Sequence, residues 1–242
     1  MKIKEKIMGD IADIIKDGPI NIVALGDSVT HGAVAFAEID YETVYWNRLK
    51  QMLNNVRNNV PVNIINAGIG GTTAKTGLER LENQVLKHEP DLIIVCFGLN
   101  DVNGELDAYL NPLKEIFIRC RESGADVIFL TPNMLNTYVA EDTPPTYVEY
   151  AGKTANMQNE GRMDKYIGEA VKLANELGIP VCDCYKEWKK LSETEDTTML
   201  LANRINHPTK EMHKLFAEKL FEMIMGDTQK SEATETTMFK DV

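Results

Sequence analysis

Four short segments of this sequence carry the residue types that acyl transfer needs. Acyl transfer requires a hydroxyl nucleophile, a base that takes its proton, and hydrogen-bond donors aimed at the oxygen that becomes negative. A serine, a glycine turn, an asparagine and a histidine supply these groups in Gly26-Asp27-Ser28, Gly70-Gly71, Gly98-Leu99-Asn100-Asp101 and His207-Pro208. The segments are far apart along the chain, so they form a site only if the fold gathers them.

The elements that would gather them are short apolar runs separated by longer periodic segments. The runs are rich in Val, Ile, Leu and Phe without strict alternation, which is typical of strands buried on both faces of a parallel sheet. The longer segments repeat their apolar residues every 3.6 positions, as helices do. The predicted strands are 21–25, 62–66, 92–97, 127–130 and 179–182, and the predicted helices are 41–56, 73–87, 107–121, 163–177 and one after His207.

This alternation of strand and helix predicts βαβ units and an open parallel sheet. In such sheets, ligands bind outside the carboxyl ends of the strands. The serine, glycine and asparagine segments each follow a predicted strand, and the histidine precedes the last helix. We therefore expect all four segments to meet on one rim of the sheet.

The organisation of the chain indicates one domain over residues 1–225, because no linker-like break or internal repeat divides it. Residues 226–242 lose periodicity and gain Thr, Glu, Asp and Ser, which predicts a flexible tail. The segment 133–161 is the longest without clear period and carries three tyrosines, so we expect a functional loop there.

In this order, the four segments resemble the sequence blocks of the SGNH (GDSL-type) hydrolase family, from about Gly26 to His213. The resemblance implies an α/β fold with three α/β/α layers around a flavodoxin-like five-stranded parallel sheet. It also implies a serine ester hydrolase that works through an acyl-enzyme.

The resemblance assigns roles to particular residues. Ser28 is implied as the nucleophile and His207 as its base. The oxyanion hole is implied to consist of the backbone N–H of Ser28, the backbone N–H of Gly71 and the side-chain amide of Asn100. Asp27 and Asp101 would support these groups.

One position departs from the family pattern. The family usually places an Asp three or four residues before its histidine, and this sequence has Arg204 and Asn203 there. Such an Asp fixes the histidine tautomer, and its replacement by Asn in another hydrolase lowered kcat about 10⁴-fold. Three alternatives follow: a backbone carbonyl near Asn203 accepts the His207 Nδ1–H, the Asn203 side chain does so, or turnover is poor.

The composition argues against nucleic-acid and membrane partners, and the sequence contains no motif for a cofactor. The 242 residues carry 26 Lys and Arg against 37 Asp and Glu, a net charge of −11, which argues against nucleic acid and anionic membranes. We expect neither a metal site nor a cofactor. The four cysteines form no Cys-x-x-Cys pair and are expected to be reduced core thiols, which favours a cytoplasmic location.

The substrate is expected to be a small-molecule acyl ester, most simply an O-acetyl group on a carbohydrate, because segment 133–161 offers aromatic and polar groups suited to a sugar. Two alternatives stay open: a lysophospholipase or thioesterase of the same family, and a catalytically weak protein that binds esters or carbohydrates. Oligomeric state is not readable from one sequence.

Overall fold

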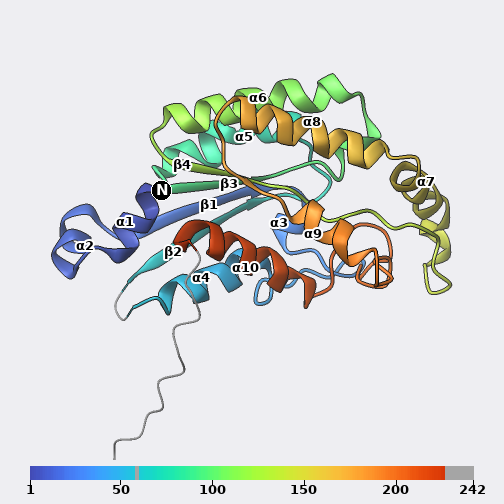
Figure 1. Ribbon diagram of the computed structural model, residues 1–242, viewed down its shortest axis with the longest axis horizontal. Helices are drawn as coiled ribbons and strands as arrows, with labels where there is room; N and C mark the ends of the chain where they lie inside the picture. Colours follow the sequence, from blue (N-terminus) through green and yellow to red (C-terminus); the bar gives the residue numbers. More distant parts are fainter. Residues whose placement is uncertain (58–59, 227–242) are drawn as a thin grey trace, which may run out of the picture.

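The computed structural model describes residues 1–57 and 60–226, and its centre is a sheet of parallel strands (Figure 1). The strand order is β2-β1-β3-β4-β5. This order is that of the flavodoxin-like doubly wound fold. The strands are β1 (Ile20–Gly26), β2 (Val62–Gly68), β3 (Leu92–Cys96), β4 (Asp126–Leu130) and β5 (Val181–Cys182).

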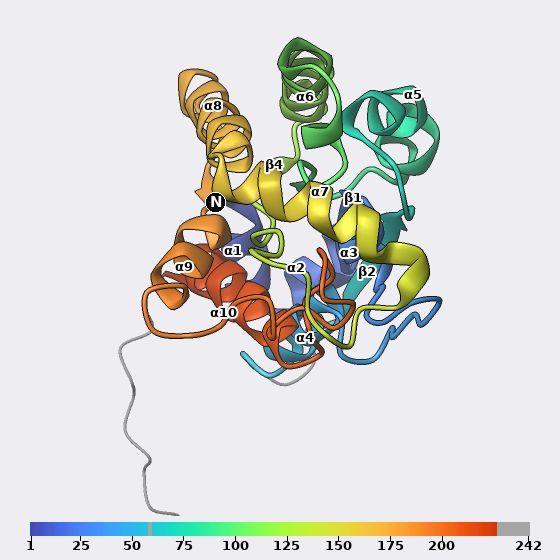
Figure 2. The same ribbon diagram turned by 90° about the vertical axis from the view of Figure 1, so that its right-hand side faces the viewer.

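Helices cover both faces of this sheet, as the end view in Figure 2 shows. One face carries α5 (Ala74–Gln84), α6 (Leu106–Glu122) and α8 (Arg162–Glu176). The other carries α4 (Tyr45–Asn54) and α10 (Met212–Met225), with α9 (Cys184–Leu191) beside α10. The three-layer α/β/α prediction is therefore confirmed.

Two cores explain why the strands read as continuous apolar runs. Successive side chains of a strand point to opposite faces of the sheet. In β3, Ile93 and Val95 pack beneath α5, α6 and α8, whereas Leu92 and Ile94 pack against α4 and α10. All four are fully buried, so neither face of the strand has a place for polar residues.

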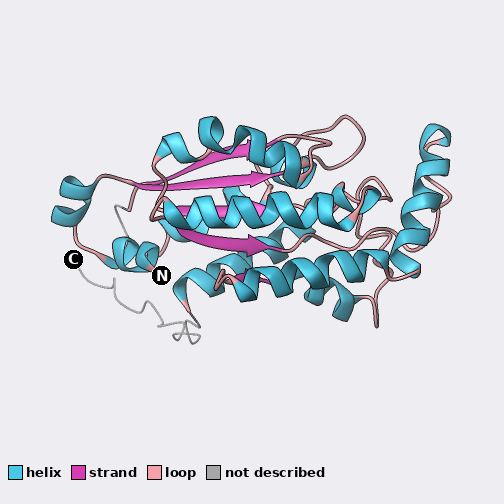
Figure 3. Ribbon diagram, turned by 90° about the horizontal axis from the view of Figure 1, so that it is seen from above, coloured by secondary structure: helices cyan, strands magenta, loops and turns pink. Residues whose placement is uncertain are grey.

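Shorter elements close the two ends of the sheet. At the amino edge lie α1 (Lys2–Met8) and α2 (Ile11–Asp17), and at the carboxyl edge lies α7 (Val148–Asn159), which crosses the strand ends (Figure 3). Arrowheads in Figure 3 point toward α7. The remaining short helices are α3 (Ser28–His31) and the single turns η1 (Leu86–His88), η2 (Asp101–Asn103) and η3 (Pro145–Tyr147).

The segment 133–161 differs from the expected loop, since it contains η3 and the twelve-residue helix α7. The buried positions of α7 carry small or polar side chains, namely Ala151, Thr154, Ala155 and Gln158. For this reason the sequence shows only a weak apolar pattern with a period of 3.6 residues. The helix α9 was also not predicted. The predicted tail, apart from Gly226, lies outside the described residues, and the single domain over 1–225 stays a prediction.

Two further observations concern the cysteines and the character of the helices. Cys96, Cys120, Cys182 and Cys184 are all buried and free, as the sequence predicts. In residues 1–57 and 60–226, no helix has the length and apolar character needed to cross a bilayer.

Candidate active site

Ser28 lies at the carboxyl end of β1, as the first residue of the short helix α3. The carboxylate of Asp27 accepts the N–H of Val29 at 3.0 Å and so caps this helix. Gly32, with φ of +105°, ends α3 after one turn. The strand, cap and turn hold the Ser28 side chain at the rim with 7% of its surface exposed.

Close contact between β1, β2 and α3 fixes this turn. A Cβ on Gly68 would overlap the backbone of Thr30 and His31, so only glycine lets the end of β2 lie against α3. The guanidinium of Arg80 donates to the carbonyls of Gly26, at 2.8 Å, and Ala67. This side chain therefore ties the carboxyl ends of β1 and β2 together beneath Ser28.

His207 reaches Ser28 from the loop before α10. Its Nε2 lies 3.0 Å from the Ser28 Oγ, although 179 residues separate the two in the sequence. This distance is that of a nucleophile–base hydrogen bond. Burial lowers the pKa of His207, and the hydrogen bond to the Val34 backbone opposes that shift. The neutral form, which is the one that takes up a proton, is therefore favoured.

The other ring nitrogen of His207 has a backbone partner. Nδ1 lies 3.1 Å from the carbonyl oxygen of Val34, in the loop that follows α3. A carbonyl can only accept, so Nδ1 carries the proton and Nε2 presents its lone pair to Ser28. One alternative placed such a carbonyl near Asn203, but the acceptor lies in a segment 173 residues from His207.

Asn203 has a different role from the one expected at its position. Its Oδ1 accepts the backbone N–H groups of Ile205, Asn206 and His207 at 3.0, 2.9 and 2.9 Å, and its Nδ2 donates to Asn206 Oδ1. The side-chain oxygen is thus used by the loop and does not bond the imidazole. Asn203, 4% exposed, shapes the turn that carries His207.

The candidate oxyanion donors lie in the loops that follow β1, β2 and β3. In the described part of the chain, neither the Ser28 N–H nor the Gly71 N–H donates to a protein acceptor. Gly71 adopts φ of +75°, a conformation that favours glycine. A Cβ on its neighbour Gly70 would lie 3.8 Å from the Ser28 Cβ, which places this turn against the serine. Asn100 Nδ2 donates to the Thr72 carbonyl at 2.9 Å, so one of its two protons is used within the turn.

Two buried carboxyl groups support these loops. Asp101 Oδ1 accepts the N–H of Ala74 at 2.9 Å and so joins the Asn100 segment to the start of α5. Burial raises the pKa of Asp101 to about 6 and that of Asp27 to about 7. Each has one buried oxygen without a partner in the described residues, which is consistent with a protonated fraction near neutral pH.

Most polar side chains of segment 133–161 serve the fold. Asn136 Nδ2 donates to the carbonyls of Tyr138 and Ala151, and Gln158 bonds the Leu135 N–H and the Tyr185 hydroxyl. Asn136 is fully buried and Gln158 is 4% exposed. These two residues therefore do not present the sugar-binding groups that the sequence led us to expect.

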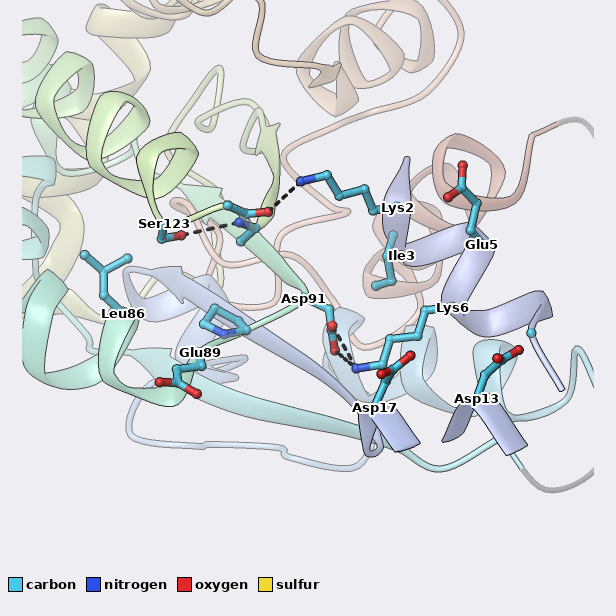
Figure 4. Close-up of a pocket in the computed structure, with 14 residues that line it drawn as sticks. Lys2, Ile3, Glu5, Lys6, Asp13, Asp17, Leu86, Glu89, Asp91 and Ser123 are labelled. Atoms are coloured by element: carbon cyan, nitrogen blue, oxygen red, sulfur yellow. Dashed lines mark hydrogen bonds and ion pairs between the residues drawn. The ribbon is translucent and has the colours of Figure 1, made fainter. Parts of the chain in front are cut away.

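A separate groove of about 810 Å³ lies at the amino-terminal ends of the strands, opposite the end that carries Ser28. It is bounded by α1, α2 and the turn before β4 (Figure 4). Lys6 there donates to both oxygens of Asp91 at 2.8 and 2.9 Å. The groove's lining, all in the described residues, includes no histidine. It is remote from Ser28 and has no part in the serine–histidine site. Elsewhere in residues 1–57 and 60–226, no group of three His, Cys, Asp or Glu side chains is arranged for a metal ion.

A serine–histidine pair beside amide donors, at the carboxyl edge of a flavodoxin-like sheet, is an arrangement suited to acyl transfer. Comparison with known proteins agrees. The pattern of the GDSL-like lipase/acylhydrolase family matches residues 24–215. The chain belongs to this family, and it is a carboxylic ester hydrolase of the SGNH type.

Individual relatives share this fold. An acetylxylan esterase from Geobacillus stearothermophilus is 25% identical over 206 residues, which cover 81% of this chain and 90% of that protein. The crystal structure of an acetylxylan esterase from the same organism aligns with a TM-score of 0.66 at 21% identity, covering 86% and 94% of the two chains. A putative GDSL-like lipase from Parabacteroides merdae aligns with a TM-score of 0.68 at 18% identity, covering 86% and 95%.

Proposed function

We propose that this chain hydrolyses small acyl esters through an acyl-enzyme on Ser28, with His207 as general base and acid. The observation that carries the proposal is the 3.0 Å contact between Ser28 Oγ and His207 Nε2. The protonated Nδ1 supports it, because it leaves Nε2 free to take the serine proton.

In the first half of the reaction, Ser28 Oγ attacks the ester carbonyl carbon while its proton passes to His207 Nε2. The carbonyl oxygen becomes an oxyanion beside the N–H groups of Ser28 and Gly71 and the Asn100 amide. One such donor contributes about 2.7–4 kcal/mol to transition-state stabilisation in other hydrolases. The bond to the leaving alcohol then breaks, and the Nε2 proton passes to the departing oxygen.

In the second half, water replaces the alcohol. His207 Nε2 takes a proton from the water, whose oxygen attacks the acyl carbon bound to Ser28. The acyl–serine bond breaks, the proton returns to Ser28 Oγ, and the carboxylic acid leaves. The enzyme ends in its starting protonation state.

The Val34 carbonyl takes over part of what an Asp does in a triad. It fixes the tautomer of His207, and loss of the correct tautomer accounts for most of the harm when a triad Asp becomes Asn. It supplies a dipole where an Asp would supply a full charge, so the imidazolium is stabilised less. We therefore propose a Ser–His dyad, with Asn203 as the residue that shapes the loop.

For the substrate, we propose O-acetyl groups on carbohydrates. The support is that relatives over most of the chain are acetylxylan esterases, one of them 25% identical. Structures of that esterase include catalytic mutants in which a serine or a histidine is replaced by alanine, which fits the roles proposed for Ser28 and His207. A cytoplasmic location is part of the proposal, supported by the four free buried cysteines.

The test is hydrolysis by purified protein of p-nitrophenyl acetate and of acetylated xylo-oligosaccharides. Ser28→Ala and His207→Ala are each expected to lower kcat by up to about 10⁶-fold, as in other serine hydrolases. Burst release of nitrophenol distinguishes an acyl-enzyme from a protein that only binds esters. Release of long-chain fatty acid from a lysophospholipid, without release of acetate from the acetylated substrates, would point to the lysophospholipase alternative. Full activity in Ser28→Ala would refute the mechanism.

A further inference from the structure

A pocket of about 410 Å³ opens beside the loop that carries His207. Its lining residues are Tyr138, Ala140, Glu141, Asp142 and Met199. It is formed by two segments that run side by side at the carboxyl edge of the sheet: the stretch leading into α7 and the loop between α9 and α10 (Figure 2). Nothing in the proposed hydrolysis uses these residues.

Tyr138 is exposed yet held in place. Its side chain is 42% exposed, and its hydroxyl donates to Asp196 Oδ2 at 2.6 Å. The hydrogen bond to this carboxylate raises the pKa of the Tyr138 phenol. The anchored hydroxyl limits movement of the ring, and the side chain lines the pocket. Met199, 46% exposed, adds a second apolar surface to the same pocket.

The polar side of the pocket is equally ordered. Arg204 Nε lies 3.1 and 3.0 Å from the two oxygens of Asp142, and its Nη2 lies 3.0 Å from Oδ2. The same guanidinium donates to the carbonyls of Met199 and Leu201. The Asp142 carboxylate is therefore fixed in orientation, although 59% of its side chain is exposed. Fixed acceptors lose little entropy when they bind a hydroxyl-rich ligand.

The negative charge around the pocket disfavours anionic ligands. Glu141, Asp142 and Asp196 place three carboxylates at or behind the pocket, against the one guanidinium of Arg204. An anionic ligand such as a uronate meets net repulsion there. A neutral ring with one apolar C–H face and several hydroxyls matches the exposed phenol face and the ordered carboxylate.

Two hydrogen bonds connect the segments that form the pocket and lie between it and the candidate active site. The Asn136 N–H donates to the Ile205 carbonyl at 2.9 Å, and the Thr137 N–H donates to the Thr198 hydroxyl at 2.9 Å. These bonds hold the two walls together between the pocket and His207. Arg204 adopts φ of +59°, so the loop turns sharply between the pocket and the histidine.

We propose that this pocket is a subsite for an uncharged sugar unit of an oligosaccharide whose acetyl group is bound at Ser28, with Tyr138 as the stacking platform. This inference rests on the proposed acetyl-esterase function. It predicts that the enzyme favours longer acetylated chains over small esters, because a small ester has no sugar unit to place in the pocket.

The test compares Tyr138→Ala with wild type on acetylated xylopentaose and on p-nitrophenyl acetate. The KM for the oligosaccharide is expected to rise about tenfold, a size typical of the loss of one aromatic contact. The loss of kcat/KM is expected to be at least fivefold larger on the oligosaccharide than on the aryl ester. Tyr138→Phe keeps the ring but loses the hydrogen bond to Asp196, so it is expected to lose less affinity than Tyr138→Ala. Ile15→Ala, an exposed apolar change on α2 at the opposite edge, is the control.

Equal losses on both esters would show that Tyr138 only supports the His207 loop and would overturn the inference, as would no loss on either. Binding of unacetylated xylopentaose, followed by calorimetric titration, separates this inference from the proposed function because it needs no hydrolysis. Weaker binding by Tyr138→Ala than by wild type supports the subsite. Absence of binding by wild type, or stronger binding of a uronate-bearing oligosaccharide, refutes it.

Discussion

The backbone carbonyl of Val34 accepts the Nδ1–H of His207 at 3.1 Å. In the described residues, this carbonyl occupies the place that an Asp side chain holds in a Ser-His-Asp triad. The bond joins the loop after α3 to the loop before α10, so the orientation of the imidazole depends on how these two loops pack.

The pH dependence of hydrolysis is expected to reflect the buried state of His207. Burial lowers its pKa below the usual value of 6.5, and the neutral ring is the active form. As pH falls, kcat/KM should therefore stay above half of its plateau at pH 6.5 and decline only at lower pH. A pH profile with p-nitrophenyl acetate measures this.

Asp27 is the control for that profile, because burial raises its pKa to about 7. This carboxyl group therefore also titrates within the pH range that the profile covers. Asp27→Asn keeps an oxygen that can accept the Val29 N–H. If the acid limb is unchanged in this variant, it belongs to His207. Disappearance of the limb would assign it to Asp27 and contradict the prediction.

Asn203 variants test whether this residue acts on the loop or on the imidazole. Asn203→Ala removes the acceptor of three backbone N–H groups and is expected to lower the free energy of unfolding by about 1–3 kcal/mol and to reduce kcat through displacement of His207. Asn203→Asp keeps the acceptor and is expected to bring no increase in kcat. Urea unfolding and steady-state kinetics measure both effects. A marked gain in kcat for Asn203→Asp would show that position 203 does reach the imidazole.

Glycine substitutions distinguish packing from conformational strain. Gly71→Ala has open space around the new Cβ, so its cost is the left-handed backbone, about 1–2 kcal/mol. Gly68→Ala puts a Cβ into the backbone of α3 and is expected to destabilise the protein more and to displace Ser28. Thermal unfolding of the two variants gives the order directly. Equal stability of both would mean that β2 and α3 are not in the close contact described.

His213 is expected to make the protein less stable in mild acid. It is fully buried, its ring stacks on Tyr45, and its pKa is lowered to about 3. Below pH 6.5 the unfolded chain takes up a proton at this residue and the folded protein does not. The contribution of His213 to the free energy of unfolding therefore falls as pH decreases from 6.5 toward 3, by up to about 1.4 kcal/mol per pH unit.

His213→Asn is the matched variant for this prediction. It retains an acceptor near the position of Nδ1, which accepts the Tyr45 N–H at 3.3 Å, and it removes the titrating group. The slope of unfolding free energy against pH should decrease in the variant between pH 4 and 6. An identical slope in both proteins would assign the acid sensitivity to other residues.

Much of the sheet and the identity of the serine and histidine segments followed from the sequence, because buried parallel strands are continuous apolar runs and the motifs stand at their ends. The helix α7 did not follow, since its buried positions are Ala, Thr and Gln. The partner of His207 could not follow either. Val34 contributes a carbonyl that every residue possesses, so no residue type signals the contact.

Asn203 shows the limit of inference from position. It stands where the family places an acid, and its amide oxygen is of the right kind to accept a proton. The three backbone N–H groups that it accepts depend on the local path of the chain from 203 to 207. Tertiary contacts with segment 133–161 hold that path in place. Such contacts cannot be predicted from the spacing of residues in the sequence.

Main-chain groups supply the acceptor for His207 and two of the three proposed oxyanion donors. A point mutation replaces a side chain and leaves the carbonyl of residue 34 and the amides of residues 28 and 71 in the polypeptide. Genetic screens for inactive variants should therefore recover few substitutions at Val34 itself. They should instead recover changes such as those at Arg80 and Asn203, whose side chains hold the loops on which these groups are carried.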